Sequence, residues 1–374
     1  MKSISVLSLF DGMSGGQQAI ERLGIKVDKY ISSEVDNHAM NVTRYNYPNT
    51  VFIGSVTEIQ IIRHSKYKLN INGYIVDYRK LILIGGSPCQ GFSFAGKMCG
   101  ASTKCQIDIT TLEQYLYLKE SGFEFEGQSY LFWEYIRIKR ELEKYNSKLI
   151  FLLENVKMTK KWEGVFNNAV GIKPTQINSS LVSAQNRVRL YWSNLGENLF
   201  QPENFNVYLS DIVEKRSDLS KNVLCAAMRG RYLVNGVRQD GKMITSGLTK
   251  QYLEVRYDGK SNCLTTVQKD NNIIEINPGE FNLKVRFELN ELSYRNLTEI
   301  ECERLQTIKD NYTKFGLNKK LEKVIIPKTQ RLRMIGNGWT IEVISFILKR
   351  LIFGANINSE AELLGDEERR IITK

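Results

Sequence analysis

The sequence predicts an α/β fold, with a doubly wound, mostly parallel sheet and a smaller, irregular β-rich domain. Three observations support this class. Short apolar runs alternate with segments of helical periodicity, a glycine-rich turn follows the first run, and polar turns end several of the others. Alternating strands and helices are typical of an open sheet covered on both faces, and its ligands bind at the carboxyl ends of the strands.

The first elements are the clearest. Residues 3–10 form an apolar run that we expect to be a buried strand, and the DGMSGG turn leads into a helix over about residues 15–23, which Gly24 ends. Three further strands are expected at residues 26–33, 50–53 and 81–84.

The middle of the chain continues the pattern. The Gly/Ser-containing stretch from residue 91 to about 111 is interpreted as a mobile loop, followed by a helix over 129–145 and a strand over 148–153. Residues 176–182 and 187–194 are expected to pair as the last two strands. Glu34, Cys89 and Glu154 then all fall just past strand ends, which indicates a single active cleft.

Beyond about residue 196 the chain has short strand-like runs, many turns and scattered cations. Helical spacing returns at residues 297–308 and 340–351, and the tail from 358 is charged. We therefore expect residues 1–195 to form the larger domain and 196–315 the smaller one. Residues 316–374 are expected to return to the larger domain.

The composition of the 374 residues, 42% hydrophobic and 25% charged, is that of an ordinary globular protein. A net charge of +11 favours a polyanionic partner such as nucleic acid, although a merely solvated surface explains it equally well. Six cysteines without a CxxC pair and two histidines predict no metal site and a reducing cytoplasm. No run has transmembrane length, and the first apolar run is too short for a signal peptide.

The first candidate site is the FDGMSGG turn at residues 10–16. Its glycines let the backbone approach a ligand closely, and the following helix amino terminus favours anionic groups. Glu34 lies about 20 residues after Gly12, where an acid can accept both ribose hydroxyls of a nucleoside. The pattern is not GxGxxG, which disfavours a dinucleotide. A plain tight turn is the alternative for this motif alone.

The second candidate is Cys89, in the GGSPCQGFS turn after a buried strand. Pro88 restrains the chain there, and nearby backbone N–H groups and cations favour the reactive thiolate. The alternative is a small buried cysteine, which is common. The flanking glycines make that alternative less attractive.

Two later motifs add charged groups. LLENV places Glu154 at the end of a buried strand, where a carboxyl group can donate a proton, or where it can be only a helix cap or an ion-pair partner. In QNRVR, Arg187 and Arg189 are two residues apart, so an extended strand would place both on one side with Gln185. A solvated pair of cations is the alternative.

Taken in order, these motifs resemble those of the DNA cytosine-5 methyltransferase family. The family has a glycine-rich turn, PCQ, ENV, QxRxR, a later LTxxExxxLQ segment and a GN dipeptide. This chain has FDGMSGG, SPCQGFS, LLENV, AQNRVR, RNLTEIECERLQT and MIGNGW. The resemblance covers most of the chain and extends to the catalytic domain of the animal de novo branch. It implies the S-adenosylmethionine-dependent methyltransferase fold and that cofactor.

The resemblance also implies a role for each motif. Cys89 would attack carbon 6 of a cytosine flipped out of duplex DNA, and Glu154 would bond to its ring nitrogen 3 and exocyclic amine. Arg187 and Arg189 would hold the base and the catalytic loop. The loop at 91–111 would close over the base, and residues 196–315 would recognise the target sequence.

The remaining implied contacts are with cofactor and DNA. Those with the cofactor are expected at Phe10, Asp11, Gly12, Met13, Ser14, Gly15, Glu34, Val35, Ser55, Val56, Ser87, Pro88, Asn337 and Trp339. Those with DNA are expected at Gln90, Ser93, Arg229, Arg231, Thr265 and Thr266. Ser55 departs from the family, which has an Asp at this place near the cofactor adenine. Cys99 and Cys105 have no role that the motifs assign.

Two rival functions follow from the same residues. One is an RNA methyltransferase with the same fold, although that group has a PFT-like sequence after the cysteine and this chain has QGFS. The other is an inactive DNA-binding subunit, against which the presence of Cys89, Glu154 and both arginines argues. We expect a monomeric, cytoplasmic enzyme of a bacterium or phage-infected cell, serving restriction-modification or phage protection, without membrane or metal partners.

Overall fold

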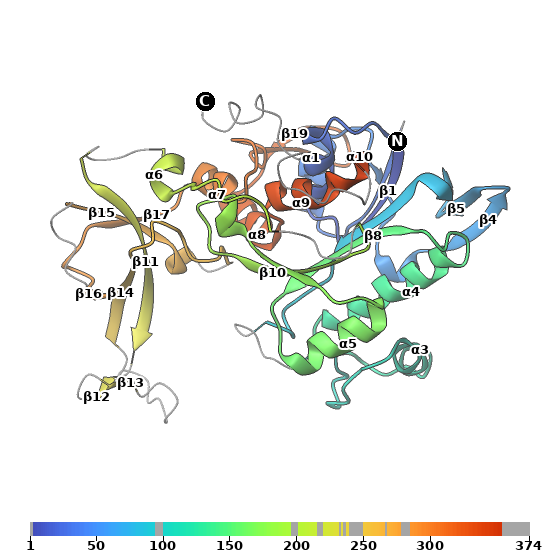
Figure 1. The fold of residues 1–374 in the computed structure, drawn as a ribbon, viewed down its shortest axis with the longest axis horizontal. Coiled ribbons are helices and arrows are strands. Elements are labelled where there is room, and N and C mark those ends of the chain that lie inside the picture. Colours follow the sequence, from blue (N-terminus) through green and yellow to red (C-terminus); the bar gives the residue numbers. More distant parts are fainter. Residues whose placement is uncertain are drawn as a thin grey trace. The chain divides into compact units, whose positions relative to one another are not determined.

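The computed structural model describes residues 3–93, 100–195, 201–214, 220–231, 233–234, 237–238, 250–265, 268–277 and 285–353. It divides the chain into two compact units (Figure 1). Unit 1 comprises Met1–Ile177, Val188–Glu203 and Ile341–Lys374, and unit 2 comprises Asn178–Arg187 and Asn204–Thr340.

A seven-stranded sheet forms the centre of unit 1, with the strand order β3-β2-β1-β7-β8-β10-β9. The strands β3, β2, β1, β7 and β8 run parallel, and β10 is antiparallel to β8. Their bounds are β1 Ile4–Leu9, β2 Val27–Ser33, β3 Val51–Phe52, β7 Leu81–Gly86, β8 Ile150–Val156, β9 Thr175–Asn178 and β10 Val188–Ser193. The predicted fold class is confirmed, and the last two predicted strands are indeed neighbours.

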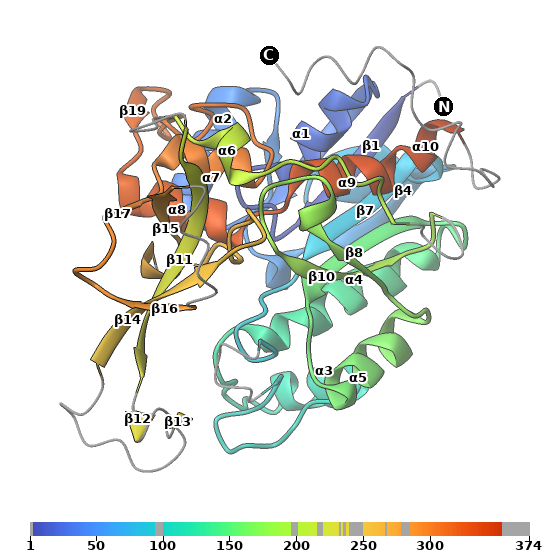
Figure 2. The same ribbon diagram turned by 60° about the vertical axis from the view of Figure 1, so that its left-hand side comes forward.

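Helices cover both faces of this sheet. Figures 1 and 2 show α1 and α9 on one face and α4 and α5 on the other. The helices of unit 1 are α1 Gly15–Arg22, α2 Asn37–Asn46, α3 Leu112–Glu120, α4 Phe132–Glu143, α5 Lys160–Val170, α9 Ile341–Leu348 and α10 Arg350–Phe353. Each long helix turns an apolar stripe toward the strands, which is what the helical spacing of 129–145 predicts.

Aromatic rings fill the core under α4 and α5. Phe132 stacks on Phe166 with 3.7 Å between ring centroids, and the Trp192 ring of β10 lies 5.2 Å from Phe166. All three side chains are fully buried. Burying rings of this size stabilises the sheet by roughly 2–3 kcal/mol each, so these contacts fix β10 beside β8.

Three short strands between β3 and β7 were not predicted. They are β4 Ile61–Ser65, β5 Lys68–Ile71 and β6 Tyr74–Asp77, which form an antiparallel sheet of their own, here called the meander. Leu69, Ile71 and Val76 are buried beneath it, so one face joins the main core.

The strand ends differ from the prediction in two places. The two glycines Gly85 and Gly86 belong to β7, and they pair with Leu153 and Glu154 of β8. The prediction that Glu154 follows its strand is therefore wrong, since β8 continues to Val156 because β10 pairs alongside it. Segment 100–111, expected to be mobile, forms bridges and buries Ala101 and Ile109.

Unit 2 is built on an antiparallel five-stranded sheet with the order β16-β14-β11-β15-β17. Its strands are β11 Asn222–Arg231, β14 Lys250–Arg256, β15 Asn272–Ile276, β16 Arg286–Glu288 and β17 Tyr294–Asn296. The hairpins are β12 Leu233–Val234 with β13 Val237–Arg238, and β18 Phe315–Leu317 with β19 Lys323–Ile325. The helices are α6 Leu209–Ile212, α7 Glu299–Leu305 and α8 Lys328–Asn337.

Residues 316–340 lie in unit 2, whereas the sequence analysis groups them with the larger domain. The reason is an ion pair network between α7 and α8. Arg331 Nη2 lies 3.1 Å from Glu303 Oε1, and both side chains are buried. A buried pair of this kind holds its two helices in one body, because separating them leaves two unpaired charges. The helices in the described part of the chain are all too short or too polar to cross a bilayer.

Candidate active site

The turn after β1 is shaped by Asp11. Its carboxylate accepts hydrogen bonds from Ser8, Ser14, Tyr30 and Ser32 at 2.5–2.8 Å. Burial raises the pKa of Asp11 above its usual range, and these hydroxyl donors oppose the shift. The side chain expected to bind the cofactor is therefore directed into the protein, and only its backbone remains a candidate contact.

The backbone around Asp11 is tightly coiled. Phe10, Gly12 and Ser14 all have left-handed φ angles, of 55°, 57° and 58°. A Cβ atom at Gly12 would meet nothing within 4 Å, so the space in front of this residue is open. Of the other predicted contacts here, Met13, Ser14 and Gly15 are buried, and Phe10 is half-buried.

Glu34 closes this turn from the end of β2. Its Oε2 accepts the Gly12 N–H at 2.7 Å, and its Oε1 accepts those of Val35 and Asp36 at 2.7 and 2.8 Å. Burial raises the pKa of Glu34, and the N–H donors oppose the shift. A carboxylate has about four acceptor positions, so Oε2 retains capacity for a ligand hydroxyl. Val35 beside it is 65% exposed and presents an apolar surface next to this carboxylate.

Ser55 stands just after β3. Its hydroxyl accepts the Thr57 N–H at 3.2 Å and caps a short 3-10 helix, Val56–Glu58. The neighbouring Gly54 carbonyl accepts a hydrogen bond from the Ser33 hydroxyl at 2.7 Å, which ties this turn to the end of β2. Ser55 therefore lies at the same edge of the sheet as Glu34, while Val56 is buried.

Cys89 follows β7 in a turn held at both ends. Before it, the Asn155 amide donates to the Ser87 carbonyl and hydroxyl at 3.2 and 2.9 Å. After it, the Phe92 and Ser93 N–H groups both donate to the Cys89 carbonyl at 2.9 Å. The thiol is half-buried against the edge of the core, so the turn fixes its position without enclosing it.

Glu154 lies in β8 beside the start of this turn, since it pairs with Gly86 across the sheet. Arg189 Nε lies 3.0 Å from Glu154 Oε1, and both side chains are about one-tenth exposed. Asn155 was not predicted as a site residue, but its hydrogen bonds to Ser87 join the ENV segment to the cysteine turn. We call Gly12, Glu34, Cys89, Glu154 and Arg189 the strand-end site, because they cluster at the carboxyl ends of β1, β2, β7 and β8.

Arg187 and Arg189 have different partners. The two belong to different units, and the Arg187 guanidinium, 3% exposed, donates to the carbonyls of Gly336 and Gly338 at 3.2 and 2.8 Å. It also reaches the Leu264 carbonyl at 3.4 Å. The expected ridge of both arginines on one strand face is therefore wrong, because Arg187 precedes β10 and turns into unit 2.

Two glutamines extend this arrangement. Gln185 accepts the Leu264 N–H at 2.8 Å and donates to Gln306, whose own amide donates to the Ile335 and Gly338 carbonyls at 2.8 and 3.2 Å. Both glutamine side chains are fully buried. We call Gln185, Arg187 and Gln306 the polar hub. It joins the QNRVR, LQT and GNG motifs to the Leu264–Thr265 segment.

Comparison with known proteins adds the family. The model of the C-5 cytosine-specific DNA methylases matches residues 4–170 and 180–352. The chain belongs to this family. The predicted family, fold class and S-adenosylmethionine cofactor are thereby confirmed. The description of the family also names the predicted enzyme class.

Relatives support this family assignment over parts of the chain. The Type II methyltransferase M.NgoBV of Neisseria gonorrhoeae is 36% identical over 104 residues, which are 27% of this chain and 22% of that protein. M.Eco47II of Escherichia coli is 27% identical over 58% of this chain and 38% of its own length. The matched segments thus span well under half of the length of each of these two relatives. The structure of the Entamoeba histolytica methyltransferase EhMeth has a TM-score of 0.53 at 12% identity, covering 94% and 99% of the two chains, and shows a common fold.

The predicted DNA-contacting residues of this methylase-family chain are scattered over both units. Gln90 is exposed and Ser93 half-buried next to Cys89. In unit 2, Arg229 lies on β11, 3.7 Å from the Glu254 carboxylate, and the exposed Thr265 bonds to Asp270. Arg231 ends β11, but its side chain, Thr266 and Cys99 lie outside the described residues.

Two further predicted cofactor residues lie in unit 2, whereas Pro88, which is half-buried beside Cys89, belongs to unit 1. Asn337 is the last residue of α8 and is exposed, and Trp339 is half-buried. Gly336 packs so closely that a Cβ atom there would lie 3.1 Å from the Thr265 carbonyl oxygen, so the GNG segment and the threonine segment are in contact. Among the residues that the structure describes, no three His, Cys, Asp or Glu side chains form a metal-binding group.

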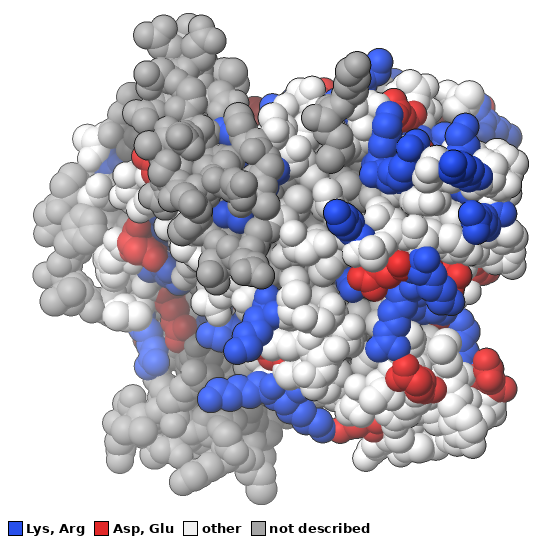
Figure 3. All heavy atoms as spheres, turned by 45° about the vertical axis from the view of Figure 1, so that its right-hand side comes forward, with Lys and Arg blue, Asp and Glu red and all other residues white. Residues whose placement is uncertain are grey.

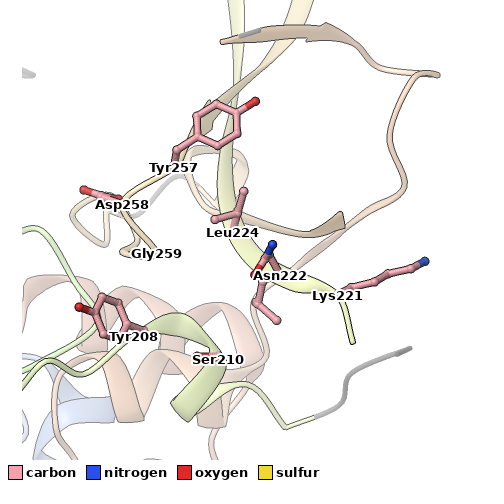
Figure 4. Close-up of a pocket in the computed structure, with 9 residues that line it drawn as sticks. Tyr208, Ser210, Lys221, Asn222, Leu224, Tyr257, Asp258 and Gly259 are labelled. Carbon is pink, nitrogen blue, oxygen red and sulfur yellow. The ribbon is translucent and has the colours of Figure 1, made fainter. Parts of the chain in front are cut away.

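Unit 2 also contains a pocket of about 260 Å³ between α6 and β11. Figure 4 shows Tyr257 on one side of it and Tyr208 on the other. It is lined by Tyr208, Ser210, Lys221, Asn222, Val223, Leu224, Tyr257, Asp258 and Gly259. None of these is a predicted site residue, so the pocket takes no part in the chemistry considered below.

Proposed function

We propose that this chain transfers a methyl group from S-adenosylmethionine to carbon 5 of a cytosine flipped out of duplex DNA. The observation that carries the proposal is the strand-end site. A half-buried thiol and a paired carboxylate stand at adjacent strand ends, in a chain of the C-5 cytosine-specific DNA methylase family. The thiol supplies a nucleophile, and the carboxylate supplies a partner for the polar edge of the base.

The residues around Gly12 fit the cofactor. The open space in front of Gly12, the acceptor capacity of Glu34 and the exposed Val35 side chain offer room, a ribose partner and an apolar surface. When bound, S-adenosylmethionine supplies an electrophilic methyl group on a sulfonium. Ser55 stands at the same sheet edge, where the family has a carboxylate.

The chain's own residues account for the remaining steps. The Cys89 thiolate forms a bond to carbon 6 of the cytosine, and the electron pair of the 5,6 double bond becomes available at carbon 5 to take the methyl group. Glu154, oriented by Arg189, bonds to ring nitrogen 3 and the exocyclic amine and stabilises the charge that develops on the ring. Loss of the carbon 5 proton to solvent water then restores the double bond and expels the thiolate, giving 5-methylcytosine and S-adenosylhomocysteine.

The deciding experiment compares Cys89→Ser with Cys105→Ser, whose cysteine is exposed and lies outside the strand-end site. Plasmid DNA from cells expressing each protein is analysed by bisulfite sequencing. We expect the wild type and Cys105→Ser to protect the same cytosines from bisulfite conversion. Cys89→Ser should protect none, because a serine hydroxyl is a far weaker nucleophile at neutral pH.

A trapping assay tests the covalent step separately. A duplex with 5-fluorocytosine cannot lose a proton from carbon 5, so we expect it to form a stable adduct with the wild type and with Cys105→Ser only. Labelled cofactor with duplex DNA and with tRNA tests the substrate. Transfer to tRNA alone would overturn the DNA assignment, and DNA binding without any transfer would favour an inactive subunit.

A further inference from the structure

We propose that the meander of unit 1 is a second, sequence-independent contact for the backbone of duplex DNA. It carries more basic side chains than carboxylates, and the Asp77 that stands opposite Lys68 in the β5–β6 register is bound to Arg79. Arg63, Lys66 and Lys68 are exposed, and none has a carboxylate partner among the described residues. The acidic residue of the meander, Asp77, is already paired with Arg79 at 2.5 Å.

Neighbouring cations enlarge the same surface. Lys29 of β2 donates to the Ile75 carbonyl at 3.1 Å, and Lys80 lies 3.8 Å from Asp28. Figure 3 shows Lys and Arg side chains gathered, with few acidic ones, at the upper right, where β4 and β5 come forward from the right-hand edge of Figure 1. Lys80 and Arg79 are paired with carboxylates, so the excess positive charge comes from the other cations of this surface. Such an excess fits a polyanion better than it fits a neutral partner.

The turn between β4 and β5, the first hairpin of the meander, contains a tyrosine with a strained backbone angle. Tyr67 has a φ of 69°, a left-handed angle that costs a non-glycine residue roughly 1 kcal/mol. The second hairpin of the meander turns at Asn72-Gly73, the usual residues for such angles, with φ of 46° and 90°. The Tyr67 ring is 38% exposed and lies 4.1 Å from the Arg79 guanidinium and 5.2 Å from Lys66 Nζ. The exposed turn between β4 and β5 therefore presents an aromatic ring between two cations.

The meander is separate from the strand-end site. Its last strand leads through Tyr78–Lys80 into the start of β7, and its contacts with β2 are at Asp28 and Lys29, near the amino end of that strand. The strand-end site lies at the opposite, carboxyl ends of the same strands, about 20 Å away for a strand of six residues. A single short duplex in the active site therefore does not need the meander, whereas a second segment of a long DNA can contact it.

The proposal rests on DNA being the substrate, and the test separates the two claims. The variant replaces Arg63, Lys66 and Lys68 by serine. Its control replaces Lys144, Lys148 and Lys173, three exposed lysines elsewhere in unit 1, so the net charge changes equally. Melting temperatures check that both variants fold.

Two measurements are made on each protein. Binding to long non-target duplex DNA is followed as a function of salt. The slope of the logarithm of the binding constant against the logarithm of the salt concentration is negative, and each phosphate contact contributes about 0.9 to its magnitude. We expect this magnitude to decrease by about 2–3 for the meander variant and by less than about 1 for the control. Methylation of a short duplex with one target should be unchanged in both, while plasmid methylation should slow in the meander variant alone.

Tyr67→Asn provides an independent check. Asparagine tolerates the left-handed angle, so we expect unchanged or higher thermal stability together with severalfold weaker binding to long DNA. Equal salt slopes for the meander and control variants would overturn the proposal and leave the exposed Ile62 and Ile75 as evidence for a protein partner. Failure of the wild type to methylate the short duplex would instead overturn the proposed function.

Discussion

The strand-end site of unit 1 and the polar hub of unit 2 use similar residues in opposite ways. In the strand-end site, Glu34 and Glu154 are positioned by backbone N–H groups and by Arg189, and Cys89 remains half-buried. In the hub, the polar groups of Gln185, Arg187 and Gln306 are directed to buried groups of the chain itself. Residues of one motif set thus divide into groups that can meet a substrate and groups that hold loops together.

This contrast assigns different costs to substitutions in the two regions. Under the proposed function, replacing a strand-end residue removes an interaction with the base or with the cofactor, so the loss appears in the rate or in cofactor affinity. Replacing a hub residue leaves buried carbonyl or amide groups without partners, so the loss appears in stability. The predictions below test this division, beginning with the largest expected effect.

Glu154→Gln should lower the single-turnover methylation rate about 10²–10³-fold, with a much smaller effect on DNA affinity. Glutamine keeps the shape of the side chain but removes its charge, and with it the ion pair to Arg189 and the stabilisation of the activated ring. Rapid-quench measurements with saturating DNA give the rate directly. A near-native rate would mean that Glu154 serves only to anchor Arg189.

Arg187→Lys and Arg189→Lys form a matched pair across the two regions. At position 187, lysine cannot reproduce the planar fork that binds Gly336 and Gly338, so we expect a loss of roughly 2–3 kcal/mol in the free energy of unfolding. At position 189, lysine keeps a cation near Glu154, so we expect a loss below about 1 kcal/mol but a lower rate per folded molecule.

Urea unfolding and single-turnover rates on both proteins decide this pair. Equal destabilisation of the two variants would contradict the division between site and hub. A normal unfolding free energy for Arg187→Lys with a reduced rate would return Arg187 to the role that the sequence analysis gives it.

Arg229→Ala should cost about 1–3 kcal/mol of affinity at the cognate sequence and relax one position of the methylation pattern, if this β11 side chain reads a guanine edge. Glu254, 3.7 Å away, already interacts with it, so Glu254→Gln serves as the control that frees the same guanidinium. Sequencing of methylated plasmid libraries gives the pattern. Uniform weakening over all sequences with a shallower salt slope would identify a phosphate contact instead.

The strand-end site could be predicted because local sequence creates it. A buried run followed by a polar turn fixes where a side chain emerges, and Glu34 and Cys89 indeed follow β2 and β7. The limit of β8 could not be predicted, since pairing with β10 extends that strand through Glu154. The meander did carry one visible signal, the Asn72-Gly73 pair typical of a tight hairpin.

The hub was beyond sequence reasoning for a different reason. Gln185 and Gln306 are 121 residues apart, and nothing in either local sequence says that they meet. Helix α8 was missed because its sequence, KTQRLRMIGN, is largely polar and buries only Arg331, Met334, Ile335 and Gly336. Its position depends on the Glu303–Arg331 pair, a contact between distant segments.

Ser55→Asp should have the smallest effect, a severalfold increase in affinity for S-adenosylhomocysteine. The substitution restores the carboxylate that the family has at this place, and a carboxylate accepts a stronger hydrogen bond from an amino group than a hydroxyl does. The fold should tolerate it, because Ser55 caps the 3-10 helix by accepting the Thr57 N–H, and aspartate is an equally good cap. Ser55→Ala is the control, losing the cap without adding charge. Calorimetric titration of the three proteins gives the affinities. Weaker binding by Ser55→Asp than by the wild type would show that a carboxylate here repels the cofactor or Glu34, and that this chain contacts the adenine through other groups.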